Sequence, residues 1–517
     1  MKIRPLPIVG AVLAVLASST AFAADTARVI VHFKPGAAAS AHRATMSAAG
    51  ARAQHDIFGT NAVAMEVPRT ALKGLQNNPN VEFVEEDVKR YPLALTSPST
   101  GTPYATGQLV PYGIPMVQAD QLPDTFAGNR KICIIDSGYD RSHEDLKGNV
   151  DAGNVTGEYD SGTGWWYNDE NHHGTHVAGT IAAVNNAGTG VVGVNANQKI
   201  KLHIVKVFGK DGWAYSSSLT SAVNKCVAAG SHIVSMSLGG SRASKTEQRA
   251  LDSVASKGVL LIAAAGNDGN TAMSYPASYN SVMSVGAVDD KKAWATFSQY
   301  NSQVEIAAPG VQVLSTVPMG GGSESKLTVG STAYTPGGMD GSPKKTATGA
   351  LADFGIGDTV NTAMAGKVCL IARGTVDFAT KVSNCEKSGG VGAVVYNNTA
   401  GGFGGTLGTT VTNIPSVTAS DTEGAQMKGQ LGQSATVTVR ATSYAYYDGT
   451  SMATPHVSAV AALVWSHFTN CTASQIRSTL NKSAEDLGPV GRDTKFGHGL
   501  VRAKVAYDRI KSFGCGN

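Results

Sequence analysis

Three residues of this 517-residue chain have the types that activate a hydroxyl group for nucleophilic attack. Asp136 follows the apolar run 132–135, His173 precedes the small and apolar stretch Gly174–Thr180, and Ser451 lies in Gly-Thr-Ser-Met-Ala-Thr-Pro-His. A hydroxyl is a poor nucleophile unless a base takes its proton, and an imidazole base needs an acid that fixes its tautomer. The sequence therefore predicts nucleophilic catalysis by Ser451, with His173 as the base and Asp136 as its partner.

Each of these motifs has a simpler interpretation when it is taken alone. Asp-Ser-Gly is more often a turn, and a Ser in Gly-Thr-Ser is more often a helix N-cap. His172, His173 and His176 lie close enough in sequence to suggest a metal site, but the motif H-E-x-x-H is absent. Only the combination of all three motifs favours the nucleophile over these alternatives.

The surrounding sequence indicates how these side chains are positioned. From Lys131 onward, short apolar strands alternate with helical stretches, which predicts an α/β domain with a mostly parallel sheet. Asp136 ends a strand, and functional groups gather beyond the carboxyl ends of strands in such sheets. Pro455 is tolerated in a first helical turn, so Ser451 is expected at or near the N-terminus of the long apolar helix predicted over Pro455–His467. There the helix dipole and free N–H groups favour an oxyanion.

The chain order Asp, His, Ser separates this protein from other triad hydrolases. An α/β-hydrolase would run Ser, Asp, His and would need G-x-S-x-G, whereas position 453 is Ala. With these motifs the chain resembles the subtilisin-like serine proteases, or subtilases. The resemblance implies that Asp136 orients His173, that His173 is general base and then acid, and that Ser451 attacks the carbonyl. The expected function is that of a secreted serine endopeptidase, made as an autoprocessed zymogen, that hydrolyses peptide bonds through an acyl-enzyme.

Two further motifs extend the resemblance to the substrate groove. The segment Ala264–Gly269 matches the family's oxyanion loop, which implies that the Asn267 carboxamide and the Ser451 N–H bind the oxyanion. The segment Ser235–Gly240 matches a substrate-binding strand whose free backbone groups pair with an extended peptide, so broad specificity is expected. The expected walls of the primary pocket are Ser237, Leu238, Gly239, Ala264, Ala265 and Gly266.

Structural calcium is also implied by the resemblance, and no organic cofactor is expected. Gln108–Gly113 resembles the family's mature N-terminus, Asp145 lies nine positions after Asp136, and Val184–Val191 resembles a calcium loop that is one residue longer than usual. Carboxylate, amide and backbone oxygens are the ligands that Ca²⁺ prefers. The expected ligands are Gln108, Asp145, Val184, Asn186, Thr189 and Val191.

The domain organisation follows from shifts in composition and from the same family. The end of the leading segment, Val84–Asp87, resembles that of the family's inhibitory pro-domain, and Gly366–Gly374 with Phe378 and Lys381 resembles a protease-associated (PA) domain. The expected fold is a subtilisin-like doubly wound, mostly parallel sheet with a small α+β pro-domain and an inserted β-rich PA domain. The expected order is signal peptide 1–23, inhibitor pro-domain 24–95, linker and processing zone 96–107, peptidase domain 108–319, inserted PA domain 320–442 and second peptidase part 443–517.

The N-terminus and the overall charge indicate where the protein acts. Lys2 and Arg4 precede the apolar run 8–17, and Ala21-Phe22-Ala23 fits a cleavage site after Ala23, which predicts secretion to the extracellular space. A membrane anchor is the alternative, but the run is short for a span. The net charge is +4 with no basic block, so nucleic acid is not an expected partner. Expected partners are protein or peptide substrates and the chain's own pro-domain, with no membrane after signal cleavage.

The six cysteines indicate disulfides, because their count is even in a chain that is expected to be exported. Six cysteines allow 15 full pairings. Pairing neighbours in sequence gives Cys133–Cys226, Cys369–Cys385 and Cys471–Cys515. The alternative is a set of buried free thiols, whereas a metal site is disfavoured because no C-x-x-C pair exists.

Two other classes of function remain as rivals. A binding protein on an inactive protease scaffold is disfavoured because the triad and oxyanion residues are all present. A lipase or esterase is disfavoured by the order of the motifs and by the missing elbow glycine. Hydrolysis of casein would exclude the first rival, and a comparison of protein with triglyceride substrates would exclude the second.

Overall fold

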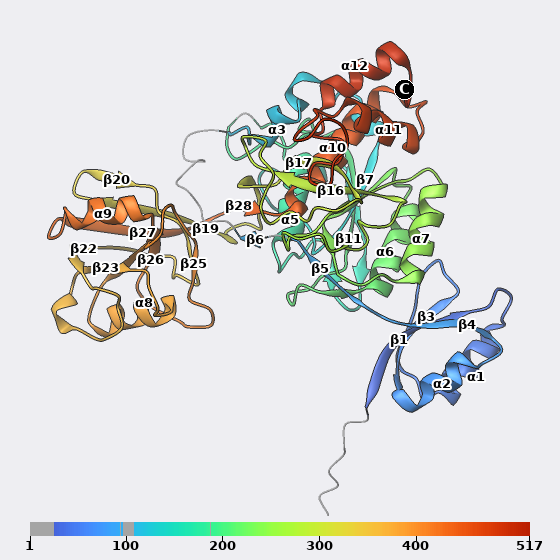
Figure 1. The fold of residues 1–517 in the computed structure, drawn as a ribbon, viewed down its shortest axis with the longest axis horizontal. Coiled ribbons are helices and arrows are strands. Elements are labelled where there is room, and N and C mark those ends of the chain that lie inside the picture. Colours follow the sequence, from blue (N-terminus) through green and yellow to red (C-terminus); the bar gives the residue numbers. More distant parts are fainter. Residues whose placement is uncertain (1–24, 94, 97–107, 187) are drawn as a thin grey trace, which may run out of the picture. The chain divides into compact units, whose positions relative to one another are not determined.

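The computed structural model describes residues 25–93, 95–96, 108–186 and 188–517. The predicted signal peptide and nearly all of the predicted linker lie outside these residues. The described chain divides into two compact units (Figure 1). The first unit contains the residues up to Asp56 and Asn61–Glu86, and the second contains Ile57–Thr60 and Asp87–Asn517. In the described ranges, no helix combines the length and the apolar character needed to cross a membrane.

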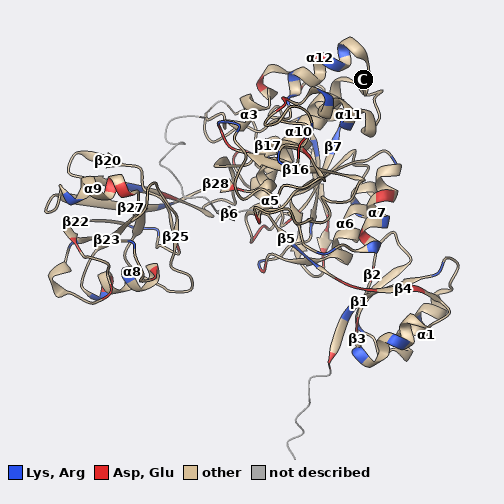
Figure 2. Ribbon diagram, viewed as in Figure 1, with Lys and Arg blue, Asp and Glu red and all other residues tan. Residues whose placement is uncertain are grey.

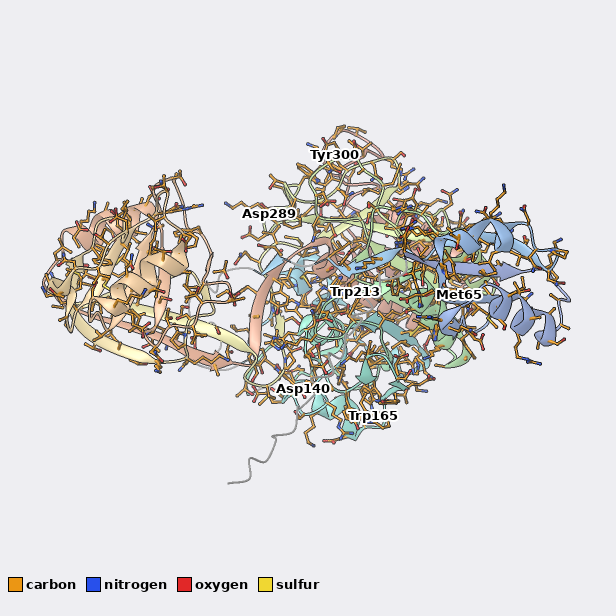
Figure 3. All side chains as sticks on the ribbon, turned by 90° about the horizontal axis from the view of Figure 1, so that it is seen from below. Met65, Asp140, Trp165, Trp213, Asp289 and Tyr300 are labelled. Carbon is orange, nitrogen blue, oxygen red and sulfur yellow. A yellow bond between two sulfur atoms is a disulfide. The ribbon has the colours of Figure 1, made fainter. Side chains whose placement is uncertain are left out.

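The first unit is a four-stranded antiparallel sheet with helices packed on one face. Alternate side chains of its central strand, Val29, Val31 and Phe33, enter the core beside Met65, which is labelled in Figure 3. The first and last strands of this unit, β1 and β4, pair with each other, in the sheet order β2-β3-β1-β4. The elements are β1 (Thr26–Phe33), α1 (Ala39–Ala48), β2 (Arg52–Asp56), β3 (Ala62–Pro68), α2 (Leu72–Gln76) and β4 (Val81–Glu86).

The second unit is built on a seven-stranded sheet in which every neighbouring pair is parallel. Its strand order is β17-β16-β15-β13-β7-β11-β8, so the chain winds outward in both directions from the region of β7 and β13. The strands are β7 (Lys131–Asp136), β8 (Val155–Gly157), β11 (Lys201–Lys206), β13 (Ile233–Met236), β15 (Leu260–Ala264), β16 (Val282–Val288) and β17 (Val304–Pro309).

Helices cover both faces of this sheet, which explains why its strands are continuous apolar runs. Ile132 and Ile134 of β7 belong to a core with α5 and α10, whereas Cys133 and Ile135 belong to a core with α6 and α7. This arrangement is the predicted doubly wound α/β fold. The helices are α5 (His173–Ala182), α6 (Ser216–Ala228), α7 (Lys245–Ser256), α10 (Thr450–His467), α11 (Ala473–Ser483) and α12 (Ala503–Phe513).

Helix α10 is apolar on all sides and lies in the centre of this unit (Figure 1), with every residue from Thr450 to Ser466 buried. The sequence predicted that Pro455 lies in the first helical turn. The helix begins five residues before Pro455, so this proline lies in the second turn instead. A proline there has no N–H to donate to the carbonyl of Ser451. The Ser237 hydroxyl donates to this carbonyl instead, at 2.8 Å.

The predicted insertion forms a second, mixed seven-stranded sheet in the order β20-β19-β27-β22-β23-β24-β26. Its first and last long strands are antiparallel neighbours, with Gly322 opposite Thr442. The elements are β19 (Gly322–Val329), β20 (Thr332–Tyr334), β21 (Met339–Asp340), β22 (Thr346–Asp353), β23 (Val368–Ala372), α8 (Phe378–Lys387), β24 (Gly392–Tyr396), β25 (Gly405–Thr406), β26 (Ser416–Ala419), α9 (Asp421–Lys428) and β27 (Ser434–Thr442).

Two small sheets connect short segments that are distant in sequence. One has the order β12-β5-β14 and the other β18-β28-β6. Their strands are β5 (Lys89–Pro92), β6 (Leu95–Thr96), β12 (Ala214–Tyr215), β14 (Leu238–Gly239), β18 (Val313–Thr316) and β28 (Tyr444–Asp448).

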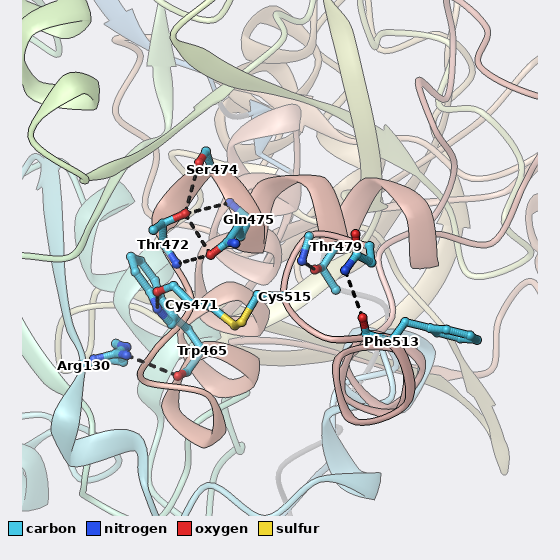
Figure 4. The surroundings of a disulfide bond; sticks show 11 residues. Arg130, Trp465, Cys471, Thr472, Ser474, Gln475, Thr479, Phe513 and Cys515 are labelled. Carbon is cyan, nitrogen blue, oxygen red and sulfur yellow. Dashed lines mark hydrogen bonds between the residues drawn. A yellow bond between two sulfur atoms is a disulfide. The ribbon is translucent and has the colours of Figure 1, made fainter.

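Three disulfides are present, and their pairing is the one predicted from neighbours in sequence. Cys133–Cys226 joins β7 to α6, and Cys369–Cys385 joins β23 to α8. Figure 4 shows the third, Cys471–Cys515, beside Trp465, whose indole N–H donates to the Cys471 carbonyl at 2.8 Å. Each bridge therefore lies within a core of its own and closes a loop of the chain.

Candidate active site

Asp136 and His173 meet at the carboxyl end of β7. The Nδ1 of His173 lies 2.7 Å from Oδ1 of Asp136, and the Ser137 N–H donates to the same oxygen at 2.7 Å. Both side chains are buried. An imidazole whose Nδ1–H donates to a carboxylate presents its Nε2 as a proton acceptor.

The absence of a side chain at Gly174 allows this contact. A Cβ atom at Gly174 would lie 2.3 Å from the Gly138 carbonyl oxygen, so the first turn of α5 can rest on the loop after β7 only because residue 174 has no side chain. The Gly174 N–H donates to the Ser137 hydroxyl at 2.8 Å and fixes this docking. The position of His173 therefore depends on backbone packing as well as on Asp136.

Ser451 is the second residue of α10 and is fully buried. Its hydroxyl donates to the Ser237 carbonyl at 2.9 Å rather than to His173. The Nε2 of His173 is buried and has no hydrogen-bond partner among the described residues. The predicted contact between Asp136 and His173 is thus present, whereas the predicted hydrogen bond between Ser451 and His173 is not formed in this structure.

Asn267 and Ser451 converge on one carbonyl oxygen of the chain itself. The Nδ2 of Asn267 donates to the Leu93 carbonyl at 2.8 Å, and the Ser451 N–H donates to the same oxygen at 3.2 Å. The Oδ1 of Asn267 accepts from the N–H and the hydroxyl of Thr450, at 2.9 and 2.8 Å. The two donors that the sequence predicted for an oxyanion therefore lie at a peptide carbonyl.

The segment that carries Leu93 is an extended strand that lies between two others. Strand β5 pairs antiparallel with β14 on one side and with β12 on the other. The Leu93 N–H donates to the Ser237 carbonyl at 3.3 Å, and a Cβ atom at Gly239 would lie 2.9 Å from the Leu93 side chain. On the β12 side, the Lys89 ammonium lies 4.1 Å above the ring of Trp213, which Figure 3 labels. Residues 89–93 thus bind as an extended peptide would.

Three of the residues predicted as pocket walls lie beside β5, and Gly266 lies at the start of α10. Ser237, Leu238 and Gly239 contact β5 directly, as described. Ala264 ends β15, and the Gly266 N–H donates to the Thr450 hydroxyl at 3.2 Å, which places this loop at the start of α10.

Two buried histidines near the site stay neutral. Burial lowers the pKa of His176 to about 3, although its Nε2 bonds the carbonyl oxygens of Val313 and Ala445 at 3.0 and 3.1 Å. Burial also lowers the pKa of His456 to about 4. Neither ring is therefore charged at neutral pH.

The predicted calcium ligands gather in one place. The Gln108 amide bonds the carbonyl oxygens of Val184 and Val191, at 2.9 and 3.1 Å. Asp145 accepts from the Val191 N–H at 2.7 Å and from the Asn186 amide at 2.8 Å. If the Gln108 amide is turned over, its oxygen joins the two carbonyls around one point, which is the donor set that Ca²⁺ prefers. Thr189 completes the loop through its N–H, which bonds Asn186 at 3.3 Å.

Sequence reasoning missed two residues of this site, Thr450 and Leu93. Thr450 fixes the orientation of the Asn267 amide, and Leu93 supplies the carbonyl that the two donors bind. Thr450 directly precedes Ser451 in the motif Gly-Thr-Ser, so its position near Ser451 could be predicted, but its hydrogen bonds to Asn267 could not. Nothing in the local sequence distinguishes Leu93 from other apolar residues of its segment.

Comparison with known proteins defines the class to which this fold and site belong. The model of the subtilase family matches residues 128–342 and 367–499, which is more than half of the chain. The chain therefore belongs to the subtilase family. It is a subtilisin-like serine protease, a hydrolase that acts on protein or peptide substrates.

Individual relatives agree with this assignment. Subtilisin DY of Bacillus licheniformis is 42% identical over 218 residues, which are 41% of this chain and 76% of the relative. Subtilisin E of Bacillus subtilis (strain 168) is 36% identical over 281 residues, or 53% of this chain and 68% of the relative. The crystal structure of the psychrophilic subtilisin-like protease Apa1 from Pseudoalteromonas sp. AS-11 is similar with a TM-score of 0.60 and 46% identity, and covers 79% of this chain and 100% of that one.

Proposed function

We propose that this protein is a secreted serine endopeptidase that cuts its own leader and then other polypeptides through an acyl-enzyme. Asp136, His173 and Ser451 form the triad, and Asn267 with the Ser451 N–H forms the oxyanion hole. The observation that carries the proposal is the Leu93 carbonyl, which accepts hydrogen bonds from both oxyanion donors. A peptide bond bound in this way has its carbonyl carbon beside the nucleophile.

Each step of the proposed reaction uses a residue of this site. The Ser451 hydroxyl leaves the Ser237 carbonyl, gives its proton to Nε2 of His173 and attacks the carbonyl carbon. Asp136 holds the Nδ1–H and stabilises the imidazolium, while Asn267 and the Ser451 N–H stabilise the oxyanion. The imidazolium then protonates the leaving amine, and the acyl-enzyme is hydrolysed by a water that His173 deprotonates.

The leader is proposed to act first as a substrate and then as an inhibitor. Residues 89–93 occupy the groove in the orientation of a substrate, so the bond that follows Leu93 is the expected processing site. This bond lies just before the predicted processing zone 96–107. Beyond it, β6 pairs with β28, which holds the chain on the other side of the bond. Backbone pairing of this kind accepts many sequences and supports broad specificity.

Two further elements of the proposal concern stability and access. The donor set around Gln108 and Asp145 is proposed to hold a structural Ca²⁺, which takes no part in the chemistry. The insertion is proposed to be a PA domain that shapes the access of large substrates. Its mixed sheet agrees with the expected β-rich fold.

The test of this function is the variant Ser451→Ala in the full chain. We expect the variant to remain an unprocessed precursor with no measurable proteolysis, because loss of this nucleophile lowers turnover by about 2 × 10⁶, a size known from a subtilisin. The wild type should mature, and N-terminal sequencing should show a cut after Leu93 before any further trimming. As a matched control, Ser253→Ala removes an exposed serine of α7 and should mature normally. Normal maturation of Ser451→Ala in a protease-free host would contradict the proposal.

A further inference from the structure

Arg90 is the largest of the fully buried side chains in the described ranges, although it belongs to the strand that lies in the substrate groove. Its neighbours Lys89 and Tyr91 are exposed, Tyr91 by 46%. Successive side chains of a strand point to opposite faces. Arg90 therefore enters the protein while the residues on either side of it face solvent.

The partner of Arg90 is Glu247, which is also fully buried. The Nη2 of Arg90 donates to Oε1 of Glu247 at 2.8 Å, and its Nε donates to Oε2 at 3.1 Å. Two parallel bonds of this kind match the planar guanidinium fork and cannot be reproduced by a lysine. Burial alone lowers the pKa of Arg90, but Glu247, together with Tyr279, outweighs it, so the pKa lies above its ordinary value.

Glu247 is held by groups that do not belong to the leader. It is the third residue of α7, a helix with charges of both signs in Figure 2, and its N–H donates to the capping Ser244 hydroxyl at 3.2 Å. The Tyr279 hydroxyl in turn bonds both the N–H and the carbonyl of Ser244, at 2.8 and 2.9 Å. The backbone that carries Glu247 is therefore fixed by groups outside the leader.

We propose that Glu247 forms a specificity pocket for the side chain of an arginine at the fourth substrate position before the cleaved bond. The first position is the residue that supplies the carbonyl of that bond. This inference rests on the proposed function, because the position is counted from Leu93 in the oxyanion hole. Leu93, Pro92, Tyr91 and Arg90 then occupy the first to the fourth position. Preferred substrates carry Arg at the fourth position, and the peptidase binds its side chain with a buried carboxylate rather than in an apolar cavity.

The first experiment uses internally quenched peptides that copy residues 88–96, with Arg, Lys, Gln or Glu at the position of Arg90. The enzyme is the mature protein obtained from the full chain. We expect kcat/KM to fall in the order Arg, Lys, Gln, Glu, because only Arg satisfies both carboxylate oxygens. The Arg peptide should exceed the Gln peptide by about 30-fold or more, as expected for a buried charge pair that loses one partner.

The second experiment uses variants of the enzyme. In Glu247→Gln, kcat/KM for the Arg peptide should differ from kcat/KM for the Gln peptide by no more than about threefold. The kcat/KM for the Gln peptide itself should stay within about threefold of the wild-type value. Asp252→Asn, at an exposed acid of the same helix, should keep the wild-type ratio. Arg90→Gln alters only the leader, so its precursor should mature slowly and yield an enzyme with the wild-type ratio. If Glu247→Gln fails to mature, Arg90→Gln/Glu247→Gln, in which no unpaired charge remains, supplies the enzyme.

The outcomes separate this inference from the proposed function. Equal cleavage of the Arg and Gln peptides by the wild type would overturn the inference and leave the peptidase function standing, with the ion pair acting only in the precursor. An unchanged ratio in Glu247→Gln would also overturn it. Failure to cleave any of the peptides or casein would overturn the proposed function itself.

Discussion

The Asn267 amide is oriented by a residue that takes no direct part in the reaction. Its Oδ1 accepts two hydrogen bonds from Thr450, from the N–H and from the hydroxyl, which leaves Nδ2 to face the bound carbonyl. The same threonine hydroxyl accepts from the Gly266 N–H. Thr450 therefore orients Asn267, and in the proposed reaction it would act on the oxyanion only through Asn267.

This arrangement predicts a graded response to substitution. Asn267→Ala should lower kcat by about 10²–10³, the size known for such a donor in a subtilisin. Thr450→Val keeps the N–H and the shape but removes the hydroxyl, so kcat should fall by about tenfold with KM unchanged. Steady-state kinetics on a chromogenic peptide measure both effects, with the exposed Thr271→Val as the control. A kcat of Thr450→Val equal to that of the wild type would show that the hydroxyl does not position Asn267.

Buried His176 predicts a loss of stability in acid. Its pKa is about 3 in the folded protein and about 6.5 in the unfolded chain. Between these values the unfolded chain binds the extra proton, so the free energy of unfolding falls as the pH falls below 6.5. This one group should cost about 2 kcal/mol between pH 7 and pH 5.

The measurement is thermal unfolding at pH 7 and pH 5 in the Ser451→Ala background, which prevents autolysis. His176→Asn should show a smaller fall in Tm between the two pH values than its parent does. The exposed His55→Asn should leave that fall unchanged. An equal fall in the parent and in His176→Asn would assign the acid sensitivity to other groups.

At the residue scale, the sequence was most informative where the chemistry is local. Asp136, His173, Ser451 and Asn267 each stand in a short motif, so their roles could be predicted together. The pair Arg90 and Glu247 spans 157 residues, and an acid in the first turn of a helix is ordinary in sequence. Only the folded chain brings such a pair together and buries it.

At the scale of elements, the loop Val184–Val191 gives a prediction about calcium. A ligand that binds only the folded state stabilises it, by about 2.7 kcal/mol when its free concentration is 100 times Kd. Chelation should therefore shorten the half-life of thermal inactivation, and Asp145→Asn should shorten it even in the presence of calcium. Asp151→Asn, which changes an exposed acid nearby, is the matched control. A half-life that does not respond to chelation would remove calcium from the proposal.

The elements themselves were partly predictable. The apolar runs from Lys131 onward predicted the strands of the parallel sheet. The start of α10 was placed too late because Pro455 usually marks a first turn, whereas the Ser237 hydroxyl compensates for its missing N–H. The pairing of β5 with β12 and β14 could not be predicted, because backbone hydrogen bonds do not depend on the identity of the side chains.

At the scale of the whole chain, the insertion begins and ends at paired strands. Before it, β18 leads out of the peptidase fold, and after it, β28 returns to the start of α10, with Thr316 opposite Tyr444 in an antiparallel pair. Inside the insertion, Gly322 lies opposite Thr442. Residues opposite each other in such a pair are about 4.5–5.5 Å apart, so a short linker can join the two ends without strain.

This geometry makes the role of the insertion testable by deletion. Replacement of residues 320–442 by a short Gly/Ser linker turns β18 and β28 into a hairpin and removes no residue of the proposed triad or oxyanion hole. Cleavage of a small chromogenic peptide should stay within about tenfold of the wild type, or about 1.4 kcal/mol in the barrier. Cleavage of a folded or fibrous protein should change much more, because the proposed role is access and not chemistry. Equal losses on both substrates in a variant that folds and matures would contradict this role, and no change on either would assign the insertion to stability or assembly.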